Sequence, residues 1–71
     1  RGIKFYQKLL NQHPMKESAR IALALLLYHE NRKTEAEKHL AQIADKKGAR
    51  KHNSEYAQRL INEWRNGEKT Q

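Results

Sequence analysis

The chain has 71 residues, enough for one domain whose small core buries only about 60% of the surface of the unfolded chain. It has no cysteine, which excludes disulfides, a thiol nucleophile and a zinc–thiolate site. A formal charge of +7 indicates attraction to an anionic partner, which can be nucleic acid, an anionic membrane or an acidic protein. Because the sequence starts at Arg1 and shows no apolar signal segment, we expect a fragment or a processed product.

The first predicted helix covers residues 3–12 and ends at His13-Pro14, because proline disfavours helix at the residue before it. Its apolar residues recur at helical spacing: Ile3, Tyr6, Leu9 and Leu10.

A central helix is predicted over residues 18–30, with eight consecutive apolar residues from Ile21 to Tyr28. This stretch is far shorter than the ~20 residues that span a bilayer. It is apolar on nearly all sides, so we expect neighbours on several of them. Ser18 is expected at the start of this helix.

A third helix is predicted to open at residues 34–37, where Thr34 and Glu37 have the spacing of a capping box. We expect Gly48 to end it. Its predicted apolar face consists of Ala36, Leu40, Ile43 and Ala44.

The last predicted helix covers residues 53–66, is capped by Asn53 or Ser54, and is followed by a frayed tail. Its apolar residues are Tyr56, Ala57, Leu60, Ile61 and Trp64, and we expect Trp64 to be a core or capping residue. No segment shows the alternation of a strand, so the predicted class is all-α with four helices.

An internal repeat appears when the sequence is shifted by 34 residues. The first helix then falls on the third, with Tyr6 on Leu40, and the central helix falls on the last, with Leu27 on Ile61. Small residues fall on small ones and large apolar residues on large apolar ones.

A period of 34 with two helices in each unit resembles the tetratricopeptide repeat family. Leu23-Ala24 stands where the family has Leu-Gly, and Leu27 where it has Tyr. Ala36 and Leu40 match the small residue and the large aromatic residue of the second helix. The sequence departs from the family's pattern at three positions. Arg20 stands where the family usually has a large apolar residue, Asn31 where it has the inter-helix Gly, and Gly48 where it has the closing Pro.

The resemblance implies antiparallel helical hairpins in a right-handed superhelical stack. Residues 1–14 would be the second helix of a partial repeat, 15–48 a full repeat, and 53–66 a C-terminal capping helix. In the family, the first helix of each pair lines a concave groove that binds partners. The positions of this sequence that correspond are Ser18, Ile21, Leu25, Tyr28 and His29. The residues also leave open that Ile21 and Leu25 are covered by an adjacent repeat or by a second copy of the chain.

A narrower resemblance concerns the strings YQKLLNQHP, ARIALALLLYHENRKTEAEKHLAQI and YAQRLINEW. They are similar to the repeat segment of bacterial surface lipoprotein assembly modifiers, outer-membrane proteins with a periplasmic tetratricopeptide domain. This resemblance implies a lipoprotein client or an assembly factor as partner, at the periplasmic face of the outer membrane.

The densest basic cluster comprises Lys46, Lys47, Arg50 and Lys51. It can contact phosphates or lipid headgroups, steer an acidic partner, or simply be a solvated connector. The four histidines lie on separate elements, and neither a metal site, a cofactor site nor a catalytic constellation is apparent.

We therefore expect a non-enzymatic module that binds a protein or peptide partner. The alternatives are a basic helical nucleic-acid-binding domain and a self-assembly segment. Nucleic acid is disfavoured because the basic residues are spread over every helix and interleaved along the chain with acidic ones. No single helix therefore stands out by the basic or amide-rich exposed face that a recognition helix needs.

Overall fold

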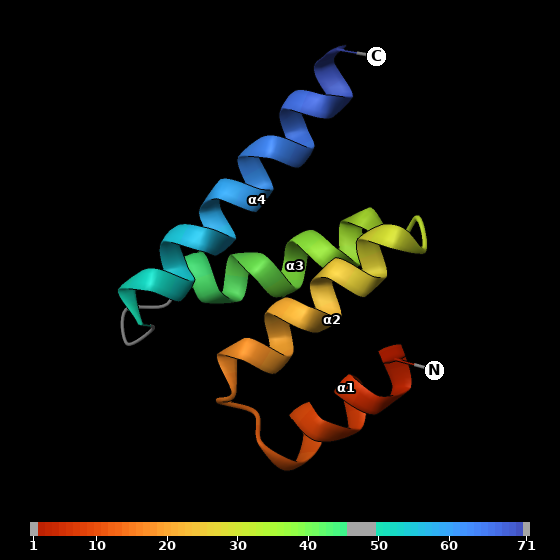
Figure 1. Cartoon of the computed structure of the whole chain (residues 1–71), viewed down its shortest axis with the longest axis vertical. Helices are drawn as coiled ribbons and strands as arrows, with labels where there is room; N and C mark the ends of the chain where they lie inside the picture. The colour runs from red at the N-terminus through yellow and green to blue at the C-terminus, as the bar shows by residue number, and fades with distance from the viewer. Residues whose placement is uncertain (1, 46–49, 71) are drawn as a thin grey trace.

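The computed structural model describes residues 2–45 and 50–70, with the side chains of residues 68–70 left aside. Over these residues the chain forms four helices and no strand, as the sequence predicts (Figure 1). The helices are α1 (Gly2–Gln12), α2 (Glu17–His29), α3 (Lys33–Ala44) and α4 (Lys51–Thr70).

Each helix packs against the next one in the chain, and α2 also touches α4. The molecule is flat, with extents of 38 × 30 × 14 Å. Figure 1 shows α1 and α4 at opposite sides of this layer, with the C-terminal part of α4 extending beyond the other helices. Helix α2 is therefore the element covered by most neighbours, which explains why its sequence is apolar on nearly all sides.

The core of the described residues is wholly apolar. The predicted packing side of α2, made of Leu23, Ala24 and Leu27, is at most 1% exposed and is confirmed. The predicted apolar faces of the other helices also lie in or against this core. The remaining buried members are Leu10, Ala19, Ile21, Ala36, Leu40, Ile43, Ala57, Leu60, Ile61 and Trp64.

The turn between α1 and α2 has the predicted break at proline. The amide of His13 still donates to the carbonyl of Leu9 at 2.8 Å, and the helix stops before Pro14. The amide of Lys16 then donates to the carbonyl of His13 at 3.1 Å, which closes the turn. This tight connection lets α1 fold back onto α2.

The turn between α2 and α3 depends on Asn31, which has a φ of 63° in the left-handed region. Its amide donates to the carbonyl of Tyr28 at 3.1 Å, and the amide of Arg32 donates to that of Leu27 at 2.9 Å. These two hydrogen bonds form a Schellman motif, in which glycine or asparagine takes the left-handed position. Asn31 therefore takes the left-handed position that ends the helix, which glycine or asparagine usually occupies.

The prediction of a capping box at residues 34–37 is wrong. Helix α3 begins at Lys33, one residue before Thr34, and the N-cap residue Arg32 makes no side-chain capping bond. Instead, the guanidinium of Arg32 forms a two-pronged ion pair with Glu35, with both N–O distances at 2.8 Å. Since both side chains are exposed, this pair contributes little to stability.

Helix α4 is longer than predicted, because it begins at Lys51 rather than residue 53 and continues to Thr70 rather than residue 66. The predicted cap at Asn53 or Ser54 is therefore wrong. The side-chain amide of Asn53 instead donates to Oε1 of Glu17 at 2.7 Å, which ties the start of α4 to the start of α2. The predicted stop at Gly48 lies outside the described residues.

Candidate functional site

The five predicted groove residues lie along α2 at spacings that place them on one side of the helix. Ser18 and His29 are exposed, whereas Leu25 and Tyr28 are half-buried. Ile21 is only 8% exposed, so this chain itself covers it and little of its surface is free for a partner. The surface offered by this side of α2 is therefore mostly polar at its ends and partly apolar at its centre.

Tyr28 stacks on Trp64 of α4, with ring centroids 4.1 Å apart and planes 4° from parallel. Trp64 is 7% exposed, which confirms its prediction as a core residue. On α3, the ammonium of Lys33 lies 5.5 Å from the centroid of the Tyr28 ring, within reach of a cation–π contact. Tyr28 is therefore the point at which three helices meet.

A surface hollow of about 420 Å³ lies beside this stack. It brings together two predicted groove residues, Tyr28 and His29, with Asn31 and Lys33. Ser18, Ile21 and Leu25 are not part of its lining. An imidazole, a phenol, an amide and an ammonium group here offer hydrogen-bond donors and acceptors at one place.

Sequence reasoning did not find the contributions of Asn31, Lys33 and Trp64 to this site. Asn31 at the family's glycine position was a signal for a tight turn, and such a turn places Lys33 beside the end of α2. The pairing of Tyr28 with Trp64 had no signal in the sequence, because it depends on how α4 returns to α2.

The predicted basic patch is described only in part, since Lys46 and Lys47 lie outside the described residues. Arg50 and Lys51 are exposed at the start of α4. The backbone amide of Arg50 donates to Oε1 of Glu17 at 3.3 Å. An acidic side chain thus lies directly beside this part of the patch, which lowers its attraction for an anionic surface.

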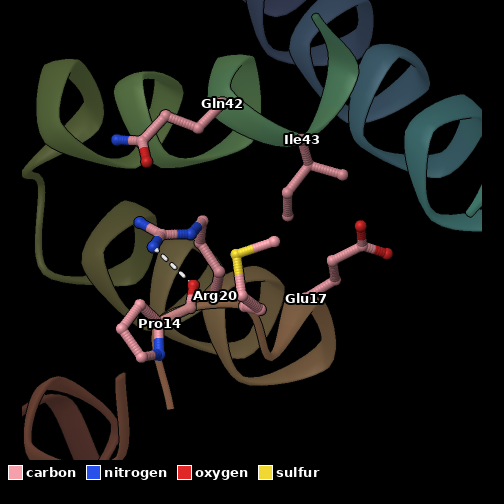
Figure 2. A pocket seen from close by; sticks show the side chains of 6 residues that line it. Pro14, Glu17, Arg20, Gln42 and Ile43 are labelled. Carbon is pink, nitrogen blue, oxygen red and sulfur yellow. Dashed lines mark hydrogen bonds between the residues drawn. The ribbon is translucent and has the colours of Figure 1, made fainter. Parts of the chain in front are cut away.

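A second polar site involves Arg20 of α2 and His39 of α3. Nη1 of Arg20 donates to Nδ1 of His39 at 3.0 Å. Nη2 of Arg20 donates to the carbonyl of Pro14 at 3.2 Å, the bond that Figure 2 shows as a dashed line. Burial lowers the pKa of His39 from its ordinary value of 6.5, and the positive charge of Arg20 lowers it further. The charge of Glu35 acts in the opposite direction. The neutral imidazole is therefore favoured, with its proton on Nε2.

Two cavities adjoin Arg20. One, of about 340 Å³, lies between the start of α2 and the end of α3, and its lining includes Arg20, Gln42 and Ile43 (Figure 2). The other, of about 520 Å³, lies between α1 and α3 and reaches His39. Neither shares a residue with the hollow at Tyr28.

Within residues 2–45 and 50–70, no group of three or more histidine or acidic side chains is placed to hold a metal ion. In the same residues, no helix is long and apolar enough to cross a membrane.

Comparison with known proteins gives no match: no family model, no curated protein and no solved structure resembles the chain significantly.

Proposed function

We propose that the chain is a tetratricopeptide-like, non-enzymatic module that binds a protein or peptide partner along the outer side of α2. The observation that carries this proposal is the register of the helices. Helix α2 begins at Glu17 and α4 begins at Lys51, 34 residues later, which equals the period of the sequence repeat. In this interpretation α2 and α3 form one repeat, and α4 is the first helix of the next.

Two further features support a repeat of this type. Asn31 adopts the left-handed conformation at the position of the family's inter-helix glycine. Ala24, Ala36 and Ala57 have no exposed surface, as small residues do where helices approach closely. We propose that the helices form antiparallel hairpins and that further repeats would continue them as a right-handed superhelix.

The proposed contact surface comprises Ser18, Leu25, Tyr28 and His29, with Ile21 supporting it from beneath. Its half-buried apolar centre suits an apolar side chain of an extended segment or helix, and its polar ends can bind the partner's backbone. The net charge of +7 favours a partner with acidic residues, because opposite charges speed association. A rigid helical surface loses little conformational entropy on binding.

On the basis of the narrower resemblance, we propose that this activity takes place at the periplasmic face of the outer membrane, with a lipoprotein client or an assembly factor as the partner. This part of the proposal depends on the sequence strings given above.

Photocrosslinking tests the proposal. A photoreactive amino acid replaces the exposed His29 in the protein as its own cells produce it, and a control carries the same amino acid in place of the exposed Lys8 on α1. We expect position 29 to capture one discrete protein that position 8 does not capture. Equal capture at both positions, or capture of only nucleic acid or other copies of the chain, would overturn the proposal.

A further inference from the structure

Arg20 is a half-buried cation that has only neutral partners among the described residues. Its two hydrogen bonds go to a backbone carbonyl, that of Pro14, and to the uncharged Nδ1 of His39. No ion pair of Arg20 is found in the described part of the chain. A guanidinium normally pairs with a carboxylate or phosphate when it leaves water, because the desolvation of a charge is costly.

The acidic residue that lines the adjoining cavity does not supply this partner. Oε1 of Glu17 accepts from the side chain of Asn53 at 2.7 Å and from the amide of Arg50 at 3.3 Å. In Figure 2 the carboxylate of Glu17 points away from the Arg20 guanidinium. Glu17 is thus turned towards α4, and the positive charge of Arg20 stays uncompensated.

The cavity of about 520 Å³ between α1 and α3, called the cleft from here on, gives a ligand access to the charge of Arg20. Gln7 and Asn11 of α1 line one side of it, His39 of α3 lines the other, and Arg20 lies between. A guanidinium has five N–H donors, of which two are used here, and its planar fork matches a carboxylate or phosphate. The side-chain amides of Gln7 and Asn11 add donors at the rim.

We propose that this cleft binds an oxyanion group, a carboxylate or a phosphate, on the free N–H donors of the Arg20 guanidinium, next to the His39 imidazole. This site is separate from the proposed contact surface, because none of the residues that line the cleft belongs to that surface or to the hollow at Tyr28.

Binding of an anion in this position has a specific electrostatic consequence for His39. The charged groups that act on the imidazole are Arg20 from α2 and Glu35 from its own helix. The α1 side of the cleft adds only uncharged side chains, among them Gln7 and Asn11. A bound anion offsets the charge of Arg20 and favours the imidazolium, so binding raises the pKa of His39.

NMR pH titration of the four histidines measures this effect on the intact chain. Spectra are recorded in sodium chloride, and at the same ionic strength with increasing inorganic phosphate or acetate. We expect a saturable rise in the pKa of His39 that exceeds the changes at His13, His29 and His52. The anion that saturates the change at the lower concentration identifies the group preferred. A change at His39 no larger than at the other three histidines would overturn the proposal.

Two variants and one control locate the site. Arg20→Gln removes the cation and is expected to abolish the saturable change. Asn11→Asp places a carboxylate at the rim of the cleft. This carboxylate repels a bound anion and competes with it for charge-assisted hydrogen bonds from Arg20, so we expect anion binding to weaken by about tenfold or more. Gln12→Glu makes the same charge change at the adjacent exposed residue, outside the cleft lining. If Arg20→Gln does not fold, as circular dichroism would show, Asn11→Asp decides. Equal effects of Asn11→Asp and Gln12→Glu would contradict the proposed site.

Discussion

Tyr28 of α2 and Trp64 of α4 are 36 residues apart in the chain, and their rings stack nearly parallel at 4.1 Å. This contact fixes α4 beside the C-terminal end of α2, where the hollow formed with His29 and Lys33 lies. A half-exposed aromatic ring held by a buried one is a rigid contact surface. The pair therefore links the packing of the last helix to the geometry of the candidate site.

The stacking energy of this pair can be measured by a double-mutant cycle with Tyr28→Ala, Trp64→Ala and the double variant. Aromatic pairs contribute about 0.5–1.5 kcal/mol beyond the area they bury, and we expect a coupling of that size. Urea denaturation followed by circular dichroism gives the four free energies of unfolding. Additive effects of the two single substitutions would show that the rings do not interact.

Because Asn31 has a left-handed conformation, we expect its replacement by alanine and by glycine to change stability in different ways. Asn31→Ala is expected to destabilise the fold by about 1 kcal/mol, because alanine lacks the short polar side chain whose local hydrogen bonding lets asparagine adopt the left-handed region. Asn31→Gly is expected to leave stability unchanged or to raise it, because glycine adopts this conformation freely. Thermal denaturation of the two variants checks the order. A more stable alanine variant would contradict the Schellman turn.

Burial along α2 predicts unequal costs for truncating two leucines. Leu27 has no exposed surface, so Leu27→Ala is expected to cost about 2–5 kcal/mol. Leu25 is half-buried, and Leu25→Ala is expected to cost clearly less. Chemical denaturation compares the two variants, and equal or reversed costs would show that the faces of α2 are assigned incorrectly.

The lowered pKa of His39 leads us to expect that the folded chain loses stability in mild acid. Because the pKa of His39 is lowered in the folded state, the unfolded chain takes up a proton at a higher pH than the folded chain does. The contribution of neutral His39 to the free energy of unfolding is complete when the pH is above 6.5, the ordinary pKa of histidine. It decreases as the pH falls from there towards the lowered pKa of the folded state.

This dependence is measured by chemical denaturation at about pH 7.5 and at successively lower pH values, through the range in which histidine titrates. His39→Gln should flatten the part of the curve below 6.5. His52→Gln removes an exposed imidazole and serves as the matched control. If both variants keep the same slope as the original chain, His39 is not the group responsible.

The sequence predicts the helices and the core well because both follow from local spacing. The apolar residues of the first helix, for example, recur every three or four positions, and the structure places them against the core. Helix ends were predicted less well. Thr34 fits a capping pattern, yet the Schellman turn at Asn31 starts α3 earlier, so that the pattern falls inside the helix.

The candidate site was predictable only where it lies on one helix. The spacing along α2 indicated Tyr28 and His29, which the structure brings into one hollow. The contributions of Trp64 and Lys33 depend on tertiary packing and on a turn, neither of which local periodicity specifies. Arg20 appeared in the sequence as a departure from the family's apolar position, and only the structure shows that it donates to His39.

The most direct test of the proposed surface is whether Tyr28 and Trp64 are in contact in solution. Trp64 is the single tryptophan of the chain, so its indole protons give unambiguous NMR signals. Nuclear Overhauser spectroscopy is expected to show strong cross-peaks between the indole of Trp64 and the ring protons of Tyr28. A chain that is helical by circular dichroism but lacks these cross-peaks would contradict the packing of α4 on α2, and with it the surface that we propose binds the partner.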